Sequence, residues 1–224
     1  VVSWRSLLRG GLRFYSLELT QPDLLIRRDA QGALHIVGVQ LSEQPAGQDG
    51  LANWLLHQSY IVVRDAHITW LDEQRAAPPL EFNQFNLLIE NGWRRHRFAV
   101  RALPPAALSA QLDLRGDFSG RSFNDMKAWS GQLYTRLDYA DVGAWRTWVP
   151  LPDGFRSGRG AVRAWLGFAD GGMNQFTADL ALADVRTQLG AGLLPLDLHT
   201  LHGRVGWRQS AQGTEVSTQQ LALR

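Results

Sequence analysis

A pattern of apolar positions that recurs along this chain restricts its fold more than any other feature. Its form is apolar-x-apolar-x-x-apolar-x-apolar-x-apolar, with mostly polar residues at x, as in LEFNQFNLLI at 80–89. Some copies are imperfect, because Pro22 and Ala66 hold the sixth place and Thr187 and Gly203 the eighth. The copies are residues 17–26, 61–70, 80–89, 180–189 and 196–205, and a shortened copy at 216–223 closes the sequence.

The pattern is that of a β-strand with one additional residue. Side chains alternate between the two faces of a strand, so a period of two places one apolar set on one face. The x-x step would move the second half of the strand to the wrong face unless a β-bulge absorbs one residue. Bulges at the same level of neighbouring strands would bend the sheet into a trough, and ten residues span about 33 Å.

Further strands are expected between turn sequences rich in Gly, Pro, Asn and Asp. Their order along the chain predicts an all-β fold, a long, curved and mostly antiparallel meander with an open apolar groove. The expected additional strands are 95–103, 109–119, 130–140 and 160–170, and the expected short helices are 50–58, 122–130 and 140–149. Trp54, Trp145 and Trp148 would anchor the helices to the sheet, or alternatively the helices would cover a lipid-filled trough.

Composition excludes several classes of protein. Among 224 residues, 45% are hydrophobic and 20% charged, which is typical of a folded chain rather than a disordered one. The basic residues are spread out and the net charge is +2, so no nucleic acid partner is expected. Without cysteine there is neither a disulfide framework nor a thiolate metal site. No apolar run reaches the ~20 residues of a membrane span, and the opening residues lack the plan of a signal peptide.

The sequence presents no arrangement typical of an enzyme. His199 and His202 have no Cys and no suitably spaced carboxylate beside them, which argues against a metal site. The Asp residues fall at expected strand ends, where Asp usually serves turns, and phosphate-binding and Gly-x-Ser-x-Gly loops are absent. Neither catalytic residues, nor a metal, nor a cofactor is therefore predicted. The basic segment at 93–97, WRRHR, favours protection of a sheet edge by charge, with binding of anionic lipid headgroups as the rival interpretation.

Long composite segments of the chain resemble the YhdP-type, AsmA-like proteins of Gram-negative envelopes. The resemblance follows the order of the chain and covers nearly all of it. The segments that carry it are 3–39, 54–105, 141–152 (DVGAWRTWVPLP) and 178–207.

The resemblance implies an inner-membrane-anchored protein with a periplasmic remainder shaped as a taco-like β-groove, similar to the chorein-type lipid-transfer bridges. It implies transfer of glycerophospholipids between the inner and outer membranes and support of the outer-membrane permeability barrier. Residues 1–224 would then be one periplasmic section of the bridge, without the N-terminal membrane helix and the C-terminal remainder of such proteins.

We therefore predict a non-enzymatic section of a lipid conduit. The outer face would carry Arg27, Glu81, Asn83, Asn86, Asp197 and Arg204. The groove would be lined by the apolar positions of the repeats, Leu17, Leu19, Leu24, Ile26, Leu80, Phe82, Phe85, Leu87, Ile89, Leu180, Leu182, Leu196, Leu198, Val205 and Trp207.

Three alternatives stay open at the level of the sequence. The first is a structural scaffold for outer-membrane biogenesis, whose apolar face is filled by its own helices. The second is an enzyme, which would need a convergent polar cluster that the sequence does not display. The third is an adhesin-like or capsid-like β domain, which is favoured only if the sheet closes into a sandwich. Exposed strand edges also predict self-association of the chain.

Overall fold

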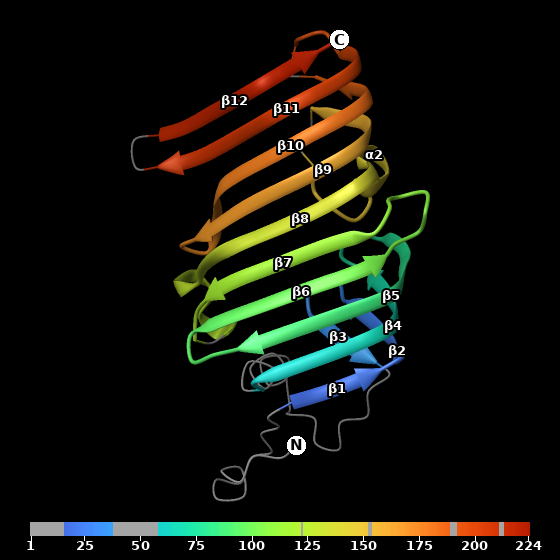
Figure 1. Ribbon diagram of the computed structural model, residues 1–224, viewed down its shortest axis with the longest axis vertical. Helices are drawn as coiled ribbons and strands as arrows, with labels where there is room; N and C mark the ends of the chain where they lie inside the picture. Colours follow the sequence, from blue (N-terminus) through green and yellow to red (C-terminus); the bar gives the residue numbers. More distant parts are fainter. Residues whose placement is uncertain (1–15, 38–57, 122, 152–153, 189–191, 211–212) are drawn as a thin grey trace, which may run out of the picture.

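The chain forms one open, curved β-sheet of 12 strands (Figure 1). The computed structural model describes residues 16–37, 58–121, 123–151, 154–188, 192–210 and 213–224. This confirms the predicted all-β fold class. The strands are β1 (Ser16–Thr20), β2 (Asp23–Arg28), β3 (Leu34–Val37), β4 (Tyr60–Asp72), β5 (Ala77–Asn91), β6 (Arg95–Leu103), β7 (Leu112–Ser119), β8 (Ser130–Asp141), β9 (Phe155–Ala169), β10 (Gly172–Thr187), β11 (Leu196–Ser210) and β12 (Gly213–Leu223).

From β4 onward the sheet is the predicted antiparallel meander, because each strand pairs with its neighbours in sequence through to β12. The N-terminal strands depart from this order. Both β1 and β2 pair with β4 in parallel, and β3 then pairs with β2. The copy at 17–26 is therefore two strand segments, broken at Gln21 and Pro22, that run along the same edge of β4.

The predicted bulges are present at the x-x step. The register shifts between Val63 and Ala66 in β4 and between Ala183 and Arg186 in β10, as it does within β5, β8 and the β11–β12 pair. The fifth residue of five copies has a positive φ, between 47° and 52°: Gln21, Asp65, Gln84, Asp184 and Gln220. These residues are the inserted ones, and a bulge bends and twists its strand locally.

The helices are shorter than predicted. The segment expected at 140–149 contains one α-helix of four residues, α2 (Val142–Trp145), capped by Asp141, whose Oδ1 accepts from the amide of Ala144 at 3.0 Å. The segment expected at 122–130 contains a 3₁₀-helix, Phe123–Ala128. The helix expected at 50–58 lies, apart from its last residue, outside the described residues. Strand β8 takes one end of each segment, since it begins at Ser130 and ends at Asp141.

The two faces of the sheet differ in character. Leu24, Val63, Ala66 and Ile68 form a buried cluster against which half-buried side chains of β1, β2 and β5 pack. The opposite face carries the exposed charged side chains of the same strands. In Figure 1, β2 and β3 pass behind β4 to β6, and Leu24 of β2 packs in one apolar cluster with residues of β4 and β5. The apolar face therefore lies inside the curl.

The connection between β8 and β9 contacts β5 past the ends of the shorter strands β6 and β7. Trp148, which follows α2, donates from Nε1 to the carbonyl of Pro78 in β5 at 3.0 Å. Trp145 packs edge-on against Trp148, with ring centroids 6.4 Å apart. The two tryptophans thus connect the β8–β9 connection to the beginning of β5 across two intervening strands.

Candidate functional site: the apolar face

All 15 residues predicted to line a groove lie on the same face of the sheet. Directly paired residues of neighbouring strands point to the same side, so the register can be followed strand by strand. Leu17 and Leu19 are level with Ile61 and Val63, which are level with Ile89 and Leu87. The same continuity joins Leu180 to Val162, Leu182 to Gly160, and Val205 and Trp207 to Ala178 and Phe176. The bulges place both halves of each repeat on this face.

Strands without a copy of the repeat complete the apolar face. One cross-strand row runs from β5 to β12 through Ile89, Phe98, Gly116, Leu133, Leu166, Phe176, Trp207 and Val216. Most of these residues are absent from the predicted groove set, because that set was drawn from the repeats alone. Simple alternation in 95–103 and 130–140 would have identified Phe98 and Leu133.

Gly116 is a position in this row where only glycine fits. A Cβ there would approach the ring of Phe98 to 2.2 Å and that of Phe118 to 2.8 Å. These two rings stack in parallel with centroids 6.2 Å apart. The missing side chain lets two phenylalanine rings cover the sheet where a third apolar side chain would otherwise stand.

Burial along the apolar face decreases toward β12. Leu24, Leu80 and Leu182 are buried, and most other predicted lining residues are half-buried. Leu196 is 39% exposed, and Val216 of β12 is 72% exposed. Among the described residues, the apolar face is therefore only partly buried, and large apolar side chains on it remain exposed.

Asp72 and His96 are two buried polar groups on the apolar face, near its margins. The carboxylate of Asp72 is 1% exposed and pairs with Arg28, whose Nε donates to Asp72 Oδ1 at 2.9 Å. This hydrogen bonding holds the pKa of Asp72 below its ordinary value, against the opposing effect of burial.

His96 is the second of these groups. It stacks on Trp129 at 5.2 Å and its Nδ1 lies 2.9 Å from Oδ1 of Asn91. Burial lowers the pKa of His96, and the carbonyl of Gly120 opposes that shift. Asp72 and His96 both form hydrogen bonds within the protein, and their geometry does not indicate a catalytic role.

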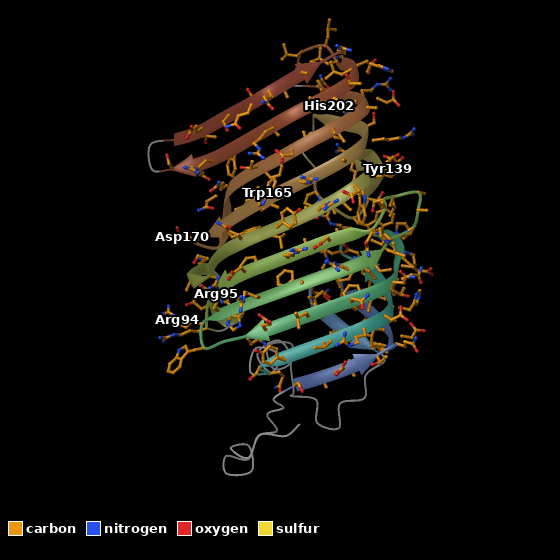
Figure 2. All side chains as sticks on the ribbon, viewed as in Figure 1. Arg94, Arg95, Tyr139, Trp165, Asp170 and His202 are labelled. Carbon is orange, nitrogen blue, oxygen red and sulfur yellow. The ribbon has the colours of Figure 1, made fainter. Side chains whose placement is uncertain are left out.

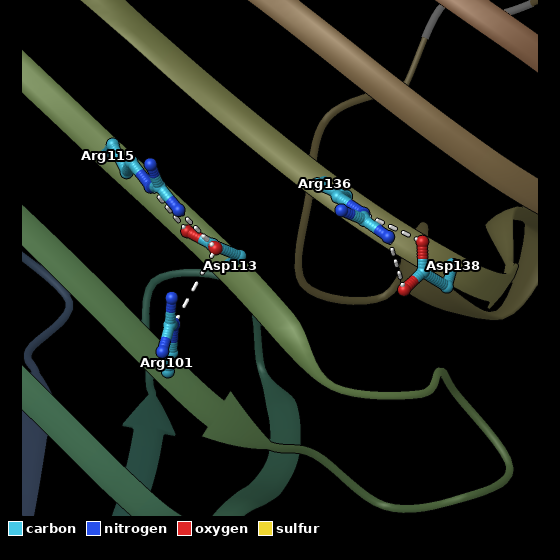
Figure 3. A network of polar contacts seen from close by, with 5 residues as sticks. All are labelled: Arg101, Asp113, Arg115, Arg136 and Asp138. Carbon is cyan, nitrogen blue, oxygen red and sulfur yellow. Dashed lines mark hydrogen bonds and ion pairs between the residues drawn. The ribbon is translucent and has the colours of Figure 1, made fainter.

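The opposite face is polar and carries many ion pairs. Asp113 accepts both Nε and a terminal nitrogen of Arg115, at 2.9 and 2.8 Å, and lies 3.7 Å from Arg101 (Figure 3). The hydrogen bonds from Arg115 lower the pKa of Asp113. The predicted outer residues Arg27, Glu81, Asn83, Asn86, Asp197 and Arg204 all lie on this face by register.

The basic segment at 93–97 does not protect a sheet edge, so that prediction is wrong. It forms the turn into β6, which lies between β5 and β7 in the interior of the sheet. Arg95 pairs with Asp117 at 2.5 Å and Arg97 with Glu90 at 2.9 Å, whereas His96 points to the apolar face. Binding of lipid headgroups by this segment stays a prediction.

Within the described ranges, no group of three or more His, Asp or Glu side chains is arranged to hold a metal ion. His202, one of the two histidines considered from the sequence, is level with Ala181 on the polar face. In the same ranges no helix has both the length and the apolar character needed to cross a membrane.

A family model described as "YhdP protein" matches residues 1–224. The chain belongs to the YhdP family. This is a family of the Gram-negative envelope and not a known enzyme family, and membership points to a role related to lipid transport. Comparisons with curated proteins and with solved structures gave no match.

Proposed function

We propose that this YhdP-family chain is a section of a lipid-transfer bridge that carries glycerophospholipids between the inner and outer membranes. The single observation that supports this most is the continuity of the apolar face. Apolar side chains follow one another in register from β5 to β12 without a paired charge in the row through Ile89 and Trp207. Acyl chains would lie along this face, and headgroups would stay in water.

The energetics suit transfer rather than tight storage. Burying apolar surface contributes about 25 cal/mol per Å², or about 0.8 kcal/mol for each CH₂ group. A repeated surface of Leu, Ile, Phe and Val offers this gain at every level of the sheet. Because no level differs strongly from the next, a bound lipid meets no deep trap. The periplasm and the outer-membrane barrier enter the proposal through the family resemblance.

Native mass spectrometry with lipid extraction tests the proposal on the purified chain. We expect phospholipids to co-purify, and the bound fraction to fall several-fold when Phe85 and Leu198 are both changed to Asn. Both side chains are half-buried on the apolar face. Leu71→Asn is the matched control, since Leu71 lies beside Arg27 on the polar face of β4.

The alternative scaffold predicts a different result. A chain with a self-filled apolar face would give a clean apo mass and take up no lipid from added liposomes. In cells, the full-length protein carrying Phe85→Asn and Leu198→Asn should fail to restore the outer-membrane permeability barrier. Normal barrier function of that variant would contradict the assignment of these residues to the lipid path.

A further inference from the structure

The polar face contains a row of residues that differs from its surroundings. Val62, Leu88, Ala99, Arg115, Tyr134, Trp165 and Thr177 are directly opposed from β4 to β10. Most of them are apolar, small or aromatic, while the rows on either side are dominated by Arg, Asp, Glu, Gln and Asn. The face therefore has a seam in which Arg115, paired with Asp113, is the one charged member of these seven residues, and it lies between two polar rims. Figure 2 shows Trp165 in the middle of the sheet.

The seam is hollowed along its length. Three hollows of about 440, 340 and 260 Å³ follow each other along it. The first and second share Leu88, Ala99 and Arg115, and the second and third share Gln132 and Trp165. They form one trough that runs across the strands, here called the polar-face trough. Seven strands spaced by ~4.8 Å give it a length of about 30 Å.

Paired charges make the rims close to neutral. On one rim Arg97 pairs with Glu90 at 2.9 Å, and on the other Arg204 pairs with Asp179 at 2.5 and 2.9 Å. Both signs occur along each rim, although Arg136 and Arg163 are directly opposed on one of them. Neither a polyanion nor a polycation is therefore strongly favoured over the length of the trough. The rims nevertheless offer carboxylate, guanidinium and amide groups, which bind hydroxyl and amide groups of a ligand well.

The floor contains an aromatic platform. Tyr134 and Trp165 have ring centroids 5.4 Å apart, and the guanidinium of Arg204 lies 5.7 Å from the Trp165 ring centroid. Trp165 remains 36% exposed. A pyranose ring combines an apolar face of C–H groups with a rim of hydroxyls, so an aromatic floor between polar planar side chains complements both parts of it.

We propose that the polar-face trough binds a linear, uncharged glycan built of β-linked pyranose units. The advance per sugar in such an extended chain is close to the spacing between strands, so each strand would present one seam residue to each successive sugar. The trough lies on the face opposite the apolar residues, so a glycan and an acyl chain would not compete. The proposal does not rest on lipid transfer, because the two ligands would occupy opposite faces and are tested by separate experiments.

Isothermal titration calorimetry of the purified chain tests the proposal. The probes are a hexamer of β-1,4-linked N-acetylglucosamine and one of β-1,4-linked glucose. We expect binding of at least one hexamer, and the choice between them separates amide-bearing glycans from plain ones. Trp165→Ala should weaken binding at least tenfold, as loss of a central aromatic contact usually does. Trp93→Ala is the matched control, because Trp93 is 87% exposed and belongs to neither face.

A thermal melt shows whether Trp165→Ala folds. If it does not fold, a second variant provides the test. Changing Gln132 and Gln175 to Ala removes two rim amides next to Trp165, and should also weaken binding. Absence of binding to both hexamers would overturn the proposal. So would binding that neither variant weakens, or binding only to a polyanion such as heparin with steep salt dependence.

Discussion

At the scale of single residues, the bulges are maintained by side chains in an unfavourable backbone conformation. Gln84 has a φ of 47° although it has a Cβ, a conformation that costs about 1 kcal/mol in residues other than glycine. The fifth residue is Gln or Asp in all five copies in which it has a positive φ. The position of the bulge therefore depends on the pattern of apolar residues around it rather than on a glycine.

Substitutions at Gln84 test this view. Gln84→Gly should leave the free energy of unfolding unchanged or raise it by up to about 1 kcal/mol, since glycine accepts positive φ. Gln84→Val should lower it by about 1–2 kcal/mol, because a β-branched residue suits that conformation poorly. Urea denaturation measures both. At Glu81, three residues earlier in the same strand, the order should reverse, and the same order at both positions would contradict the argument.

The buried ion pair gives a second prediction at this scale. Asp72→Asn leaves Arg28 without its counter-charge in a site where the Asp72 side chain is 1% exposed. We expect a loss of about 2 kcal/mol in the free energy of unfolding at pH 7, somewhat below the value for a fully buried pair because Arg28 is partly exposed.

The pH dependence of that loss follows from the lowered pKa of Asp72. A carboxylate with a depressed folded-state pKa stabilises the protein above its unfolded pKa of about 3.9. This contribution disappears as the pH falls through the folded-state value. Unfolding curves of wild type and Asp72→Asn should therefore separate at pH 7 and converge toward pH 2–3. A constant difference across that range would show that the charge of Asp72 is not its source.

At the scale of strands and helices, the sequence predicted best where side-chain periodicity decides the structure. The limits 95–103 agree with β6, and 130–140 with β8 to within one residue. The x-x step correctly located the bulges, because both halves of a repeat can lie on one face only if a bulge absorbs the additional residue. It could not locate the break at Gln21 and Pro22, since the break depends on pairing with β4, 44 residues away in sequence.

The helices illustrate the limit of local signals. The sequence predicts a helix at 140–149 that contains two Trp three residues apart, yet only Val142–Trp145 is α-helical. Trp148 then serves a distant partner, the carbonyl of Pro78. A long-range hydrogen bond of this kind leaves no trace in the local sequence, so the end of the helix could not be predicted from it.

At the scale of the whole molecule, the faces were predictable and the polar-face trough was not. Alternation assigned every predicted groove residue to one side, because burial of apolar groups affects each strand separately. The seam through Leu88, Tyr134 and Trp165 depends on which residues of different strands become level. That register is set by the lengths of the turns and by the bulges together, so no single strand reveals it.

The edge of the sheet gives the last prediction. Within the described part of the chain, β12 ends the strand order and pairs with β11 alone. All 11 of its residues are exposed, and Val216 and Leu223 extend the apolar face to the edge. An edge of this kind pairs with another chain when charge does not prevent it. We expect concentration-dependent dimerisation of the purified chain by sedimentation velocity.

Charge placed on the apolar side of that edge should prevent the association. Changing Val216 and Leu223 to Lys would place two ammonium groups on the apolar side of the edge, beside the strand that pairs with it, so the dimer fraction should fall at least several-fold. Trp93→Lys, the same type of change in an exposed turn, should leave it unaltered. A chain that stays monomeric at every concentration, or a dimer that Trp93→Lys disrupts equally, would mean that β12 is not the contact. The apolar face would then be continued by something other than a second copy of this edge.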